Sequence, residues 1–125
     1  MAGGRVLVVD DDADSRMLMA ELLTSEGYRV ATASNGREAL NQLSAETPSV
    51  ILLDLEMPVM DGRSFRQRQL QMPGPLRSVP VIVCSGSDEA TKLTAELQAF
   101  ACLSKPLPDF DPLLKHVEAA CQRSM

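Results

Sequence analysis

Short apolar runs alternate with segments of helical periodicity along the whole chain, and this alternation limits the possible folds more than any other feature. Five runs predict strands: Arg5–Val9, Tyr28–Ala33, Val50–Leu53, Val79–Cys84 and Ala101–Ser104. Strands that alternate with helices form parallel sheets, with the helices packed against the faces of the sheet. We therefore predict a single α/β domain over residues 1–125, with a five-stranded parallel sheet and five helices.

The helices are predicted from apolar spacing and from signals at their ends. They are expected at Ala13–Ser25, after Asn35-Gly36, from about Arg63 to Gln71, around Leu93, Leu97 and Phe100, and after Asp111. The spacings of four and three residues in the fourth of these predict that Leu93, Leu97 and Phe100 share one helix face. Asp111 is expected to cap the last helix, with Pro112 at its first position. The segment from residue 72 to residue 75 is expected to be a loop.

Composition and charge argue against several classes of partner. A net charge of −5 and an aromatic content of 3% disfavour direct binding to nucleic acid, which requires a basic surface and stacking side chains. The densest basic stretch, Arg63, Arg66 and Arg68, is expected to be a solvated helix face. No apolar run approaches the ~20 residues of a membrane span. A strand-like run begins within five residues of the start and leaves no room for a signal peptide, so we expect a cytoplasmic protein.

The cysteines give no sign of a disulfide framework or a zinc site. Cys84, Cys102 and Cys121 are an odd number of cysteines, and no two of them are closely spaced. Each is therefore expected to be a small buried hydrophobe.

Polar residues follow four of the five predicted strands. They are Asp10-Asp11-Asp12, Asp54, Ser85 and Lys105. Ligands of an open parallel sheet bind beyond the carboxyl ends of its strands, so these side chains are expected at one edge. Two like charges ~4 Å apart repel by about 4 kcal/mol at an effective dielectric of ~20, so the carboxylates need a cation or a shared proton. Such oxygen ligands suit Mg²⁺, and a phosphoryl group bound there would meet a carboxylate nucleophile and give an aspartyl phosphate. For any single aspartate the simpler interpretation is helix capping, with Asp12 and Asp14 as candidates.

Two longer motifs resemble the receiver domains of the two-component response-regulator family. Val6–Asp12 resembles the acidic cluster after the first strand of that family, and Leu53–Gly62 resembles its phosphoacceptor loop. Ser85 and the Lys105-Pro106 pair complete a set that covers essentially the whole chain. The resemblance implies a flavodoxin-like, doubly wound fold with strand order 2-1-3-4-5.

The resemblance also implies a role for each matching site residue. Asp54 would be the phosphorylated residue, Lys105 would pair with the phosphoryl oxygens, and Ser85 would hydrogen-bond one of them and pull its loop inward. The Mg²⁺ ligands would be Asp10, Asp11, Asp54 and the backbone carbonyl of Glu56. Such a domain catalyses its own phosphorylation and slow autodephosphorylation without turning over a metabolite.

The partners implied by the resemblance are proteins. The phosphoryl donor would be a sensor histidine kinase or a histidine phosphotransfer protein. The signal would pass through the face of the fourth helix, fifth strand and fifth helix to a downstream protein, a fused output domain or a second phosphorylated copy. Six of the seven residues from Met17 to Leu23 are apolar, more than one buried stripe requires. Met17, Leu18 and Leu22 are therefore candidates for docking the donor, and the alternative is that a methionine-rich helix fills irregularities of the core.

Two positions depart from the family pattern. Cys102 lies three residues before the lysine, where the family usually has a Tyr or Phe ring that moves inward on phosphorylation. Because a cysteine cannot replace that ring, a weaker or different conformational output is expected, and a redox-sensing thiol is the other interpretation. Glu56, two residues after the phosphoacceptor, stands where the family varies and is expected to alter autodephosphorylation.

Two other functions fit part of the pattern. In a haloacid-dehalogenase-like phosphohydrolase, Asp10 would be the nucleophile, with Asp12, Ser85 and Lys105 nearby. That interpretation leaves Asp54 without a role, and the 20 residues after the lysine leave no room for further acidic ligands or a cap. The second alternative is a phosphorylation-independent protein-binding module of the same fold. The complete acidic set argues against it, and the missing aromatic ring leaves it open.

Overall fold

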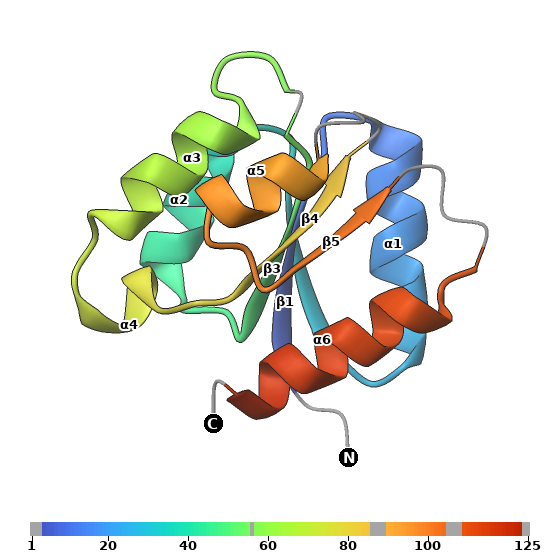
Figure 1. Cartoon of the computed structure of the whole chain (residues 1–125). Helices are drawn as coiled ribbons and strands as arrows, with labels where there is room; N and C mark the ends of the chain where they lie inside the picture. The colour runs from blue at the N-terminus through green and yellow to red at the C-terminus, as the bar shows by residue number, and fades with distance from the viewer. Residues whose placement is uncertain (1–3, 56, 86–89, 105–108, 124–125) are drawn as a thin grey trace.

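The computed structural model describes residues 4–55, 57–85, 90–104 and 109–123, without the side chains of residues 85, 90, 91, 93 and 123. Its sheet has five parallel strands in the order β2-β1-β3-β4-β5. The strands are β1 (Arg5–Val9), β2 (Arg29–Ala33), β3 (Val50–Leu53), β4 (Val81–Ser85) and β5 (Ala101–Ser104) (Figure 1). This order confirms the flavodoxin-like, doubly wound sheet.

The described residues form six helices, one more than predicted. They are α1 (Ala13–Ser25), α2 (Gly36–Ala45), α3 (Gly62–Leu70), α4 (Gly74–Arg77), α5 (Ala90–Glu96) and α6 (Asp111–Arg123). The additional helix, α4, is a single turn that includes part of the predicted loop. In this turn the amides of Leu76 and Arg77 donate to the carbonyl of Pro73 at 3.2 and 3.4 Å. Pro75 suits the position because a proline in the first turn of a helix needs no amide partner and its φ is already helical.

The sheet separates two hydrophobic layers. In the central strands, Leu7 and Ile51 point into the layer that contains residues of α2 and α3, whereas Val6 and Val50 pack with α1 and α6. Figure 1 shows α2, α3 and α5 on one side of the sheet and α1 and α6 on the other. All four strand side chains are inaccessible to solvent, and each contributes about 1.5–3 kcal/mol relative to an exposed position. Because helices cover both faces of the sheet, a ligand site is expected beyond the carboxyl ends of its strands.

The fourth predicted helix is shorter than expected. α5 ends before Leu97, and Gln98 has a positive φ of 54°, outside the right-handed helical region. The amide of Phe100 donates to the carbonyl of Val81 at 2.7 Å and begins the pairing of β5. Leu97 and Phe100 therefore pack on opposite faces of the sheet, and the prediction that they share a helix face was wrong. The side chain of Leu93 lies outside the described part.

Other element boundaries differ from the prediction by one or two residues. Asp111 is the first residue of α6 rather than its cap, because the amide of Leu114 already donates to the carbonyl of Phe110 at 2.9 Å. The amide of Asp111 is satisfied by the carboxylate of Asp109 at 3.0 Å. β4 begins two residues later than predicted, after Pro80, which has no amide to donate.

The arginines of α3 differ in their exposure. Arg63 and Arg68 are exposed, as predicted, but Arg66 is buried, with 4% of its surface accessible. The prediction of a solvated face was therefore wrong for Arg66. Its guanidinium donates to main-chain carbonyls more than 30 residues away, and such acceptors cannot be read from helical periodicity.

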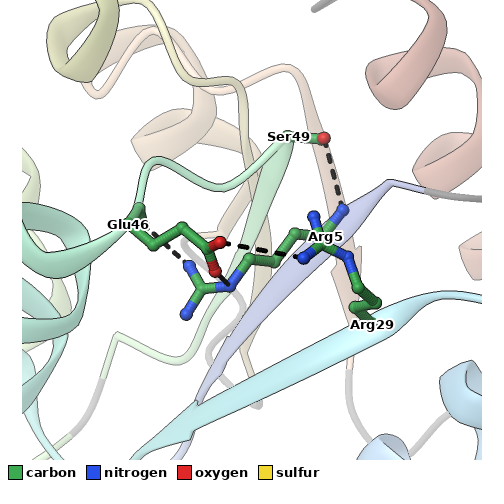
Figure 2. Close-up of polar contacts among 4 residues, drawn as sticks. All are labelled: Arg5, Arg29, Glu46 and Ser49. Carbon is green, nitrogen blue, oxygen red and sulfur yellow. Dashed lines mark hydrogen bonds and ion pairs between the residues drawn. The ribbon is translucent and has the colours of Figure 1, made fainter.

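A polar cluster lies at the amino ends of the strands, opposite the carboxyl ends that carry the aspartates. Arg5 forms an ion pair with Glu46 and donates to its main-chain carbonyl at 2.8 Å (Figure 2). The amide of Arg5 donates to the hydroxyl of Ser49 at 3.3 Å, and Arg29 lies 3.7 Å from the Glu46 carboxylate. The length of β1, about 16 Å at ~3.3 Å per residue, separates Arg5 from Asp10. The cluster therefore supports the fold and does not take part in the acidic site.

Within the described part of the chain, no disulfide joins any of the three cysteines. Cys84 and Cys121 are buried, as predicted, whereas Cys102 is half-buried. Within the part of the chain that the structure describes, no helix combines the length and the apolar character needed to cross a membrane.

Candidate functional site

The register of the sheet places Asp10 and Asp54 side by side. Val9 at the end of β1 pairs with Leu53 at the end of β3, and each aspartate is the next residue of its chain segment. The amide of Asp10 donates to the carbonyl of Ala33 at 3.1 Å, and that of Asp54 donates to Val9 at 3.0 Å. Both aspartates thus continue the hydrogen-bonded ladder, which fixes the backbone that carries their carboxylates.

Three carboxylates gather at this edge. One oxygen from each of Asp10, Asp11 and Asp54 lies within 4.8 Å of the others. Asp10 is buried, Asp54 half-buried and Asp11 exposed, so the cluster is open to solvent on one side. Octahedral Mg²⁺ has oxygen ligands at about 2.1 Å, so opposite ligands lie about 4.2 Å apart. Adjacent ligands lie closer, at about 3.0 Å, so the three oxygens would have to draw together around the ion. The all-oxygen donor set fits a hard divalent cation.

Asp12, the third residue of the acidic run, has a different role. Its carboxylate accepts hydrogen bonds from the amide of Asp14 at 3.2 Å and the hydroxyl of Ser15 at 2.9 Å, so it caps α1. The amide of Asp12 donates to the carboxylate of Asp10 at 3.0 Å. The capping interpretation is confirmed for Asp12, and its amide orients the Asp10 side chain.

Arg16 also lies beside the carboxylate cluster, although the sequence did not identify it as a site residue. Its guanidinium donates to the main-chain carbonyl of Asp10 at 2.8 Å. The pKa of the nearby Glu38 is held below its ordinary value, first by the hydroxyl of Ser34 and then by the Ser34 amide, with a smaller effect of the Arg16 charge. The only sequence feature that could have indicated this role is the position of the arginine, in the first turns of the helix that follows the acidic run.

Close backbone contacts hold the loop that follows Asp54. The amide of Gly62 donates to the carbonyl of Leu55 at 3.0 Å, and a β-carbon on Gly62 would lie 2.8 Å from the Leu55 Cα. Gly36, at the start of α2, donates to the carbonyl of Met60 at 2.9 Å, and a β-carbon there would lie 2.7 Å from the same oxygen. Since neither contact leaves room for a side chain, glycine at both positions fixes this loop against its neighbours.

The remaining predicted residues belong to the neighbouring strands and loops. Ser85 ends β4 and pairs with Ser104 at the same edge, but its side chain lies outside the described part. Glu56 and Lys105 lie outside the described residues. Cys102 is in β5 and packs against the hydrophobic layer that contains residues of α2 and α3.

Two apolar side chains in the first turns of α1 face solvent. Met17 is 63% exposed and Leu18 is 54% exposed. Met19 and Leu22 are half-buried and pack against the layer shared with α6. The prediction that some apolar residues of this helix face solvent is confirmed for Met17 and Leu18, whereas Met19 and Leu22 lie half-buried against the core.

Comparisons with known proteins agree with this geometry. The family model of the response regulator receiver domain matches residues 6–118. Response regulator MprA of Mycolicibacterium vanbaalenii is 35% identical over 122 residues, which cover 96% of this chain and 51% of MprA. Sporulation initiation phosphotransferase F of Bacillus subtilis is 31% identical over 113 residues, which cover 90% of each protein. The response regulator protein TrrA of Thermotoga maritima, solved in complex with Mg²⁺-BeF, is similar with a TM-score of 0.82 and 29% identity, over 94% of this chain and 98% of TrrA.

The chain belongs to the response-regulator receiver family. It is a receiver domain of two-component signalling, and it spans about half the length of MprA. The carboxylate cluster lies where the strand ends of this fold bring the predicted acidic residues together.

Proposed function

We propose that Asp54 accepts a phosphoryl group from a phosphohistidine of a partner protein, at a site where Asp10, Asp11 and Asp54 hold Mg²⁺. The observation that carries this proposal is the gathering of three carboxylates at the ends of β1 and β3 in a receiver-family chain. Asp54 is half-buried and matches the phosphoacceptor position of the family motif. The backbone carbonyl of Glu56 is the proposed fourth protein ligand. The proposed receiver domain extends over residues 1–125.

In the proposed reaction a carboxylate oxygen of Asp54 attacks the phosphorus atom. An O–P bond forms, the P–N bond to the imidazole breaks, and the imidazole leaves with the electron pair. When bound, Mg²⁺ supplies positive charge that offsets the carboxylates and the phosphoryl oxygens. Lys105 would pair with those oxygens, and Ser85 would donate its hydroxyl to one of them. Arg16 holds the backbone of Asp10 in place through its carbonyl.

Slow hydrolysis of the aspartyl phosphate would reset the domain without turning over a metabolite. Water attacks the phosphorus, the O–P bond to Asp54 breaks, and inorganic phosphate leaves. Glu56 is proposed to alter the rate of this step. A comparison of phosphoryl lifetimes between the parent and Glu56→Ala tests this role, and identical lifetimes would remove Glu56 from the mechanism.

The proposed output surface consists of α5, β5 and α6, which are the family's fourth helix, fifth strand and fifth helix once the short α4 is set aside. A bond from Ser85 to the phosphoryl group would draw the loop after β4 inward and move this face. Cys102 supplies no aromatic ring, so the movement would pass through the backbone of β4 and α5. We propose that this face contacts a downstream protein, a fused output domain or a second phosphorylated copy.

The exposed Met17 and Leu18 form the proposed docking surface for the helix that carries the phosphohistidine, with Leu22 at its edge. Both lie in the first two turns of α1, whose cap Asp12 is adjacent to the carboxylate cluster. A partner helix on this surface would bring its imidazole towards Asp54. Donors of this kind act in the cytoplasm, which is the proposed location of the domain. Nucleic acid and membranes are not proposed as partners.

The geometry does not favour a haloacid-dehalogenase-like hydrolase. That chemistry needs the Asp12 carboxylate beside the nucleophile Asp10, whereas Asp12 caps α1. It also gives no role to Asp54, although Asp54 belongs to the carboxylate cluster.

Intact-mass measurement after incubation with a small phosphodonor tests the proposed function. The parent is expected to gain one phosphoryl group in the presence of Mg²⁺ and none in its absence, and Asp54→Asn is expected to gain none. A hydrolase would instead lose labelling in Asp10→Asn and keep it in Asp54→Asn. Equal labelling of the parent and Asp54→Asn would reject the proposal, and no labelling of the parent would favour the phosphorylation-independent module.

A further inference from the structure

The buried side chain of Arg66 connects α3 to the carboxyl end of α5. Its Nε donates to the carbonyl of Leu97 at 2.9 Å, and its Nη2 donates to the carbonyl of Gln98 at 3.0 Å. Its Nη1 donates to the side-chain oxygen of Gln69 at 2.6 Å. Nη1 also donates to the carbonyl of Val79 at 3.5 Å, so every nitrogen of the guanidinium has a defined acceptor. Two of the four acceptors are the carbonyls of Leu97 and Gln98, which directly follow α5.

The carbonyls of Leu97 and Gln98 lie just beyond the last residue of α5, where no further helical turn supplies amide donors. The amide of Ala99 donates to the carbonyl of Thr94 at 3.0 Å and that of Gln98 donates to Ala95 at 3.3 Å, around the positive φ of Gln98. This arrangement is a Schellman motif, with glutamine in the position that usually favours glycine. The carbonyls of the last turn point outward, and a cation at this end also interacts favourably with the helix dipole.

The charge of Arg66 is held by carbonyl oxygens and not by a carboxylate. The ion pairs found among the described residues all involve Glu46, at the amino-terminal edge of the sheet. Burial lowers the pKa of Arg66, because desolvation disfavours the charged form. A buried guanidinium without a counterion persists only when its hydrogen bonds are satisfied, so Arg66 and the end of α5 each depend on the other.

Gln69 extends this connection to the segment before β4. Gln69 is completely buried, and its amide nitrogen donates to the carbonyls of Leu76 at 3.0 Å and Val79 at 3.1 Å. The pair Arg66 and Gln69, which we call the α3 clamp, therefore joins α3, α4, the approach to β4 and the end of α5. No buried side-chain nitrogen or oxygen of the described residues lacks a partner, so the clamp is fully satisfied.

We propose that the α3 clamp fixes the carboxyl end of α5 in both signalling states, so that α5 responds to phosphorylation at its amino end and pivots about its carboxyl end. The inference rests on the proposed function, since it concerns the response to a phosphoryl group on Asp54. The amino end of α5, at Ala90, follows five residues after Ser85. The carboxyl end is held by Arg66 and leads within four residues into β5. Arg66 is thus a positioning residue for the output surface.

Hydrogen exchange with and without Mg²⁺ and beryllofluoride tests the pivot in the unmodified chain. The amides of Gln98 and Ala99 are expected to change by less than about twofold on addition of beryllofluoride, whereas the peptide at the start of α5 changes by about tenfold or more. An equal change at both ends would overturn the pivot while the proposed function stands. Beryllofluoride uptake is followed by ¹⁹F resonance, and a chain that takes up none would overturn the proposed function and the pivot together.

Variants of α3 test the role of Arg66 itself. Arg66→Met removes all donors, and it is expected to speed exchange at Gln98 and Ala99 by about tenfold or more without beryllofluoride and to make that exchange sensitive to beryllofluoride. Arg68→Met, an exposed position on the same helix, is the matched control and is expected to match the parent. Arg66→Lys, which keeps the charge and fewer donors, is expected to fall between them and serves if Arg66→Met does not fold. Unchanged exchange at Gln98 and Ala99 in both Arg66 variants would overturn the proposal.

Discussion

A β-carbon at Gly62 would collide with the backbone of Asp54 and Leu55, so Gly62→Ala measures how tightly the loop that follows Asp54 is held. The new atom would lie 2.8 Å from the Leu55 Cα and would also press on the carbonyl of Asp54. Overpacking of this kind costs about 1–3 kcal/mol, whereas alanine gains only about 0.5–1 kcal/mol over glycine in a helix. Backbone atoms cannot move aside as a flexible side chain can, so the clash is expected at the upper end of its range, about 3 kcal/mol. After the gain of up to about 1 kcal/mol, the net loss is about 2 kcal/mol.

Urea unfolding followed by circular dichroism, together with the rate of phosphorylation by a small donor, checks this expectation. With a slope of about 2 kcal/mol per molar urea, the loss corresponds to a midpoint lower by about 1 M. The phosphorylation rate is expected to fall because the loop that carries Asp54 must shift. Gly74→Ala is the matched control, since a β-carbon at Gly74 meets nothing within 4 Å. If Gly62→Ala is as stable as Gly74→Ala and is phosphorylated at the parent rate, the reasoning about this loop is refuted.

Three further substitutions test separate features. Val59 is 79% exposed and has a φ of 68°, a left-handed conformation that costs a β-branched residue about 1–2 kcal/mol. Val59→Gly is therefore expected to raise the free energy of unfolding, measured by urea titration, by about 1 kcal/mol. A decrease would contradict the strain at this position. The Ser34 hydroxyl and amide lower the pKa of Glu38, so the ionised Glu38 stabilises the fold above the ordinary glutamate pKa, and this stabilisation is lost as the pH falls through the lowered pKa. Ser34→Ala is expected to raise the Glu38 pKa in an NMR titration. An unchanged pKa would refute the assignment of the shift to Ser34. Glu46→Gln removes the ion pairs with Arg5 and Arg29 at the amino ends of the strands. Thermal unfolding is expected to show a loss of stability below about 1 kcal/mol that shrinks as salt is added, with the phosphorylation rate unchanged. Slower phosphorylation would contradict the separation of this cluster from the acidic site.

The central strands and the carboxylate cluster could be predicted because local signals and sheet geometry agree. The apolar run Val50–Leu53 has no polar position, which is typical of a strand covered on both faces, and the structure shows it fully buried. Parallel strands end at one edge, so aspartates directly after β1 and β3 had to approach each other. The motif resemblance added the strand order, which apolar spacing alone does not determine.

The features that could not be predicted depend on partners distant in the sequence. The helical spacing and neighbouring arginines of Arg66 predict an exposed side chain. It is buried because the segment after α5 packs against α3 and offers the carbonyls of Leu97 and Gln98 as acceptors. The end of α5 carries no glycine or proline signal, since Gln98 takes the left-handed conformation in a context where Arg66 satisfies the freed carbonyls. The contact of Arg16 with Asp10 likewise depends on how α1 leaves the sheet. Tertiary hydrogen bonds decide all three cases.

The identity of the labelled residue tests the central claim most directly. After phosphorylation in the presence of Mg²⁺, borohydride reduction converts the aspartyl phosphate to homoserine, and fragmentation of the peptides locates it. We expect the modified residue at Asp54 alone, with no modification when Mg²⁺ is omitted. Homoserine at Asp10 or Asp11, or labelling of Asp54 that is independent of Mg²⁺, would contradict a metal-dependent phosphoacceptor at the ends of β1 and β3.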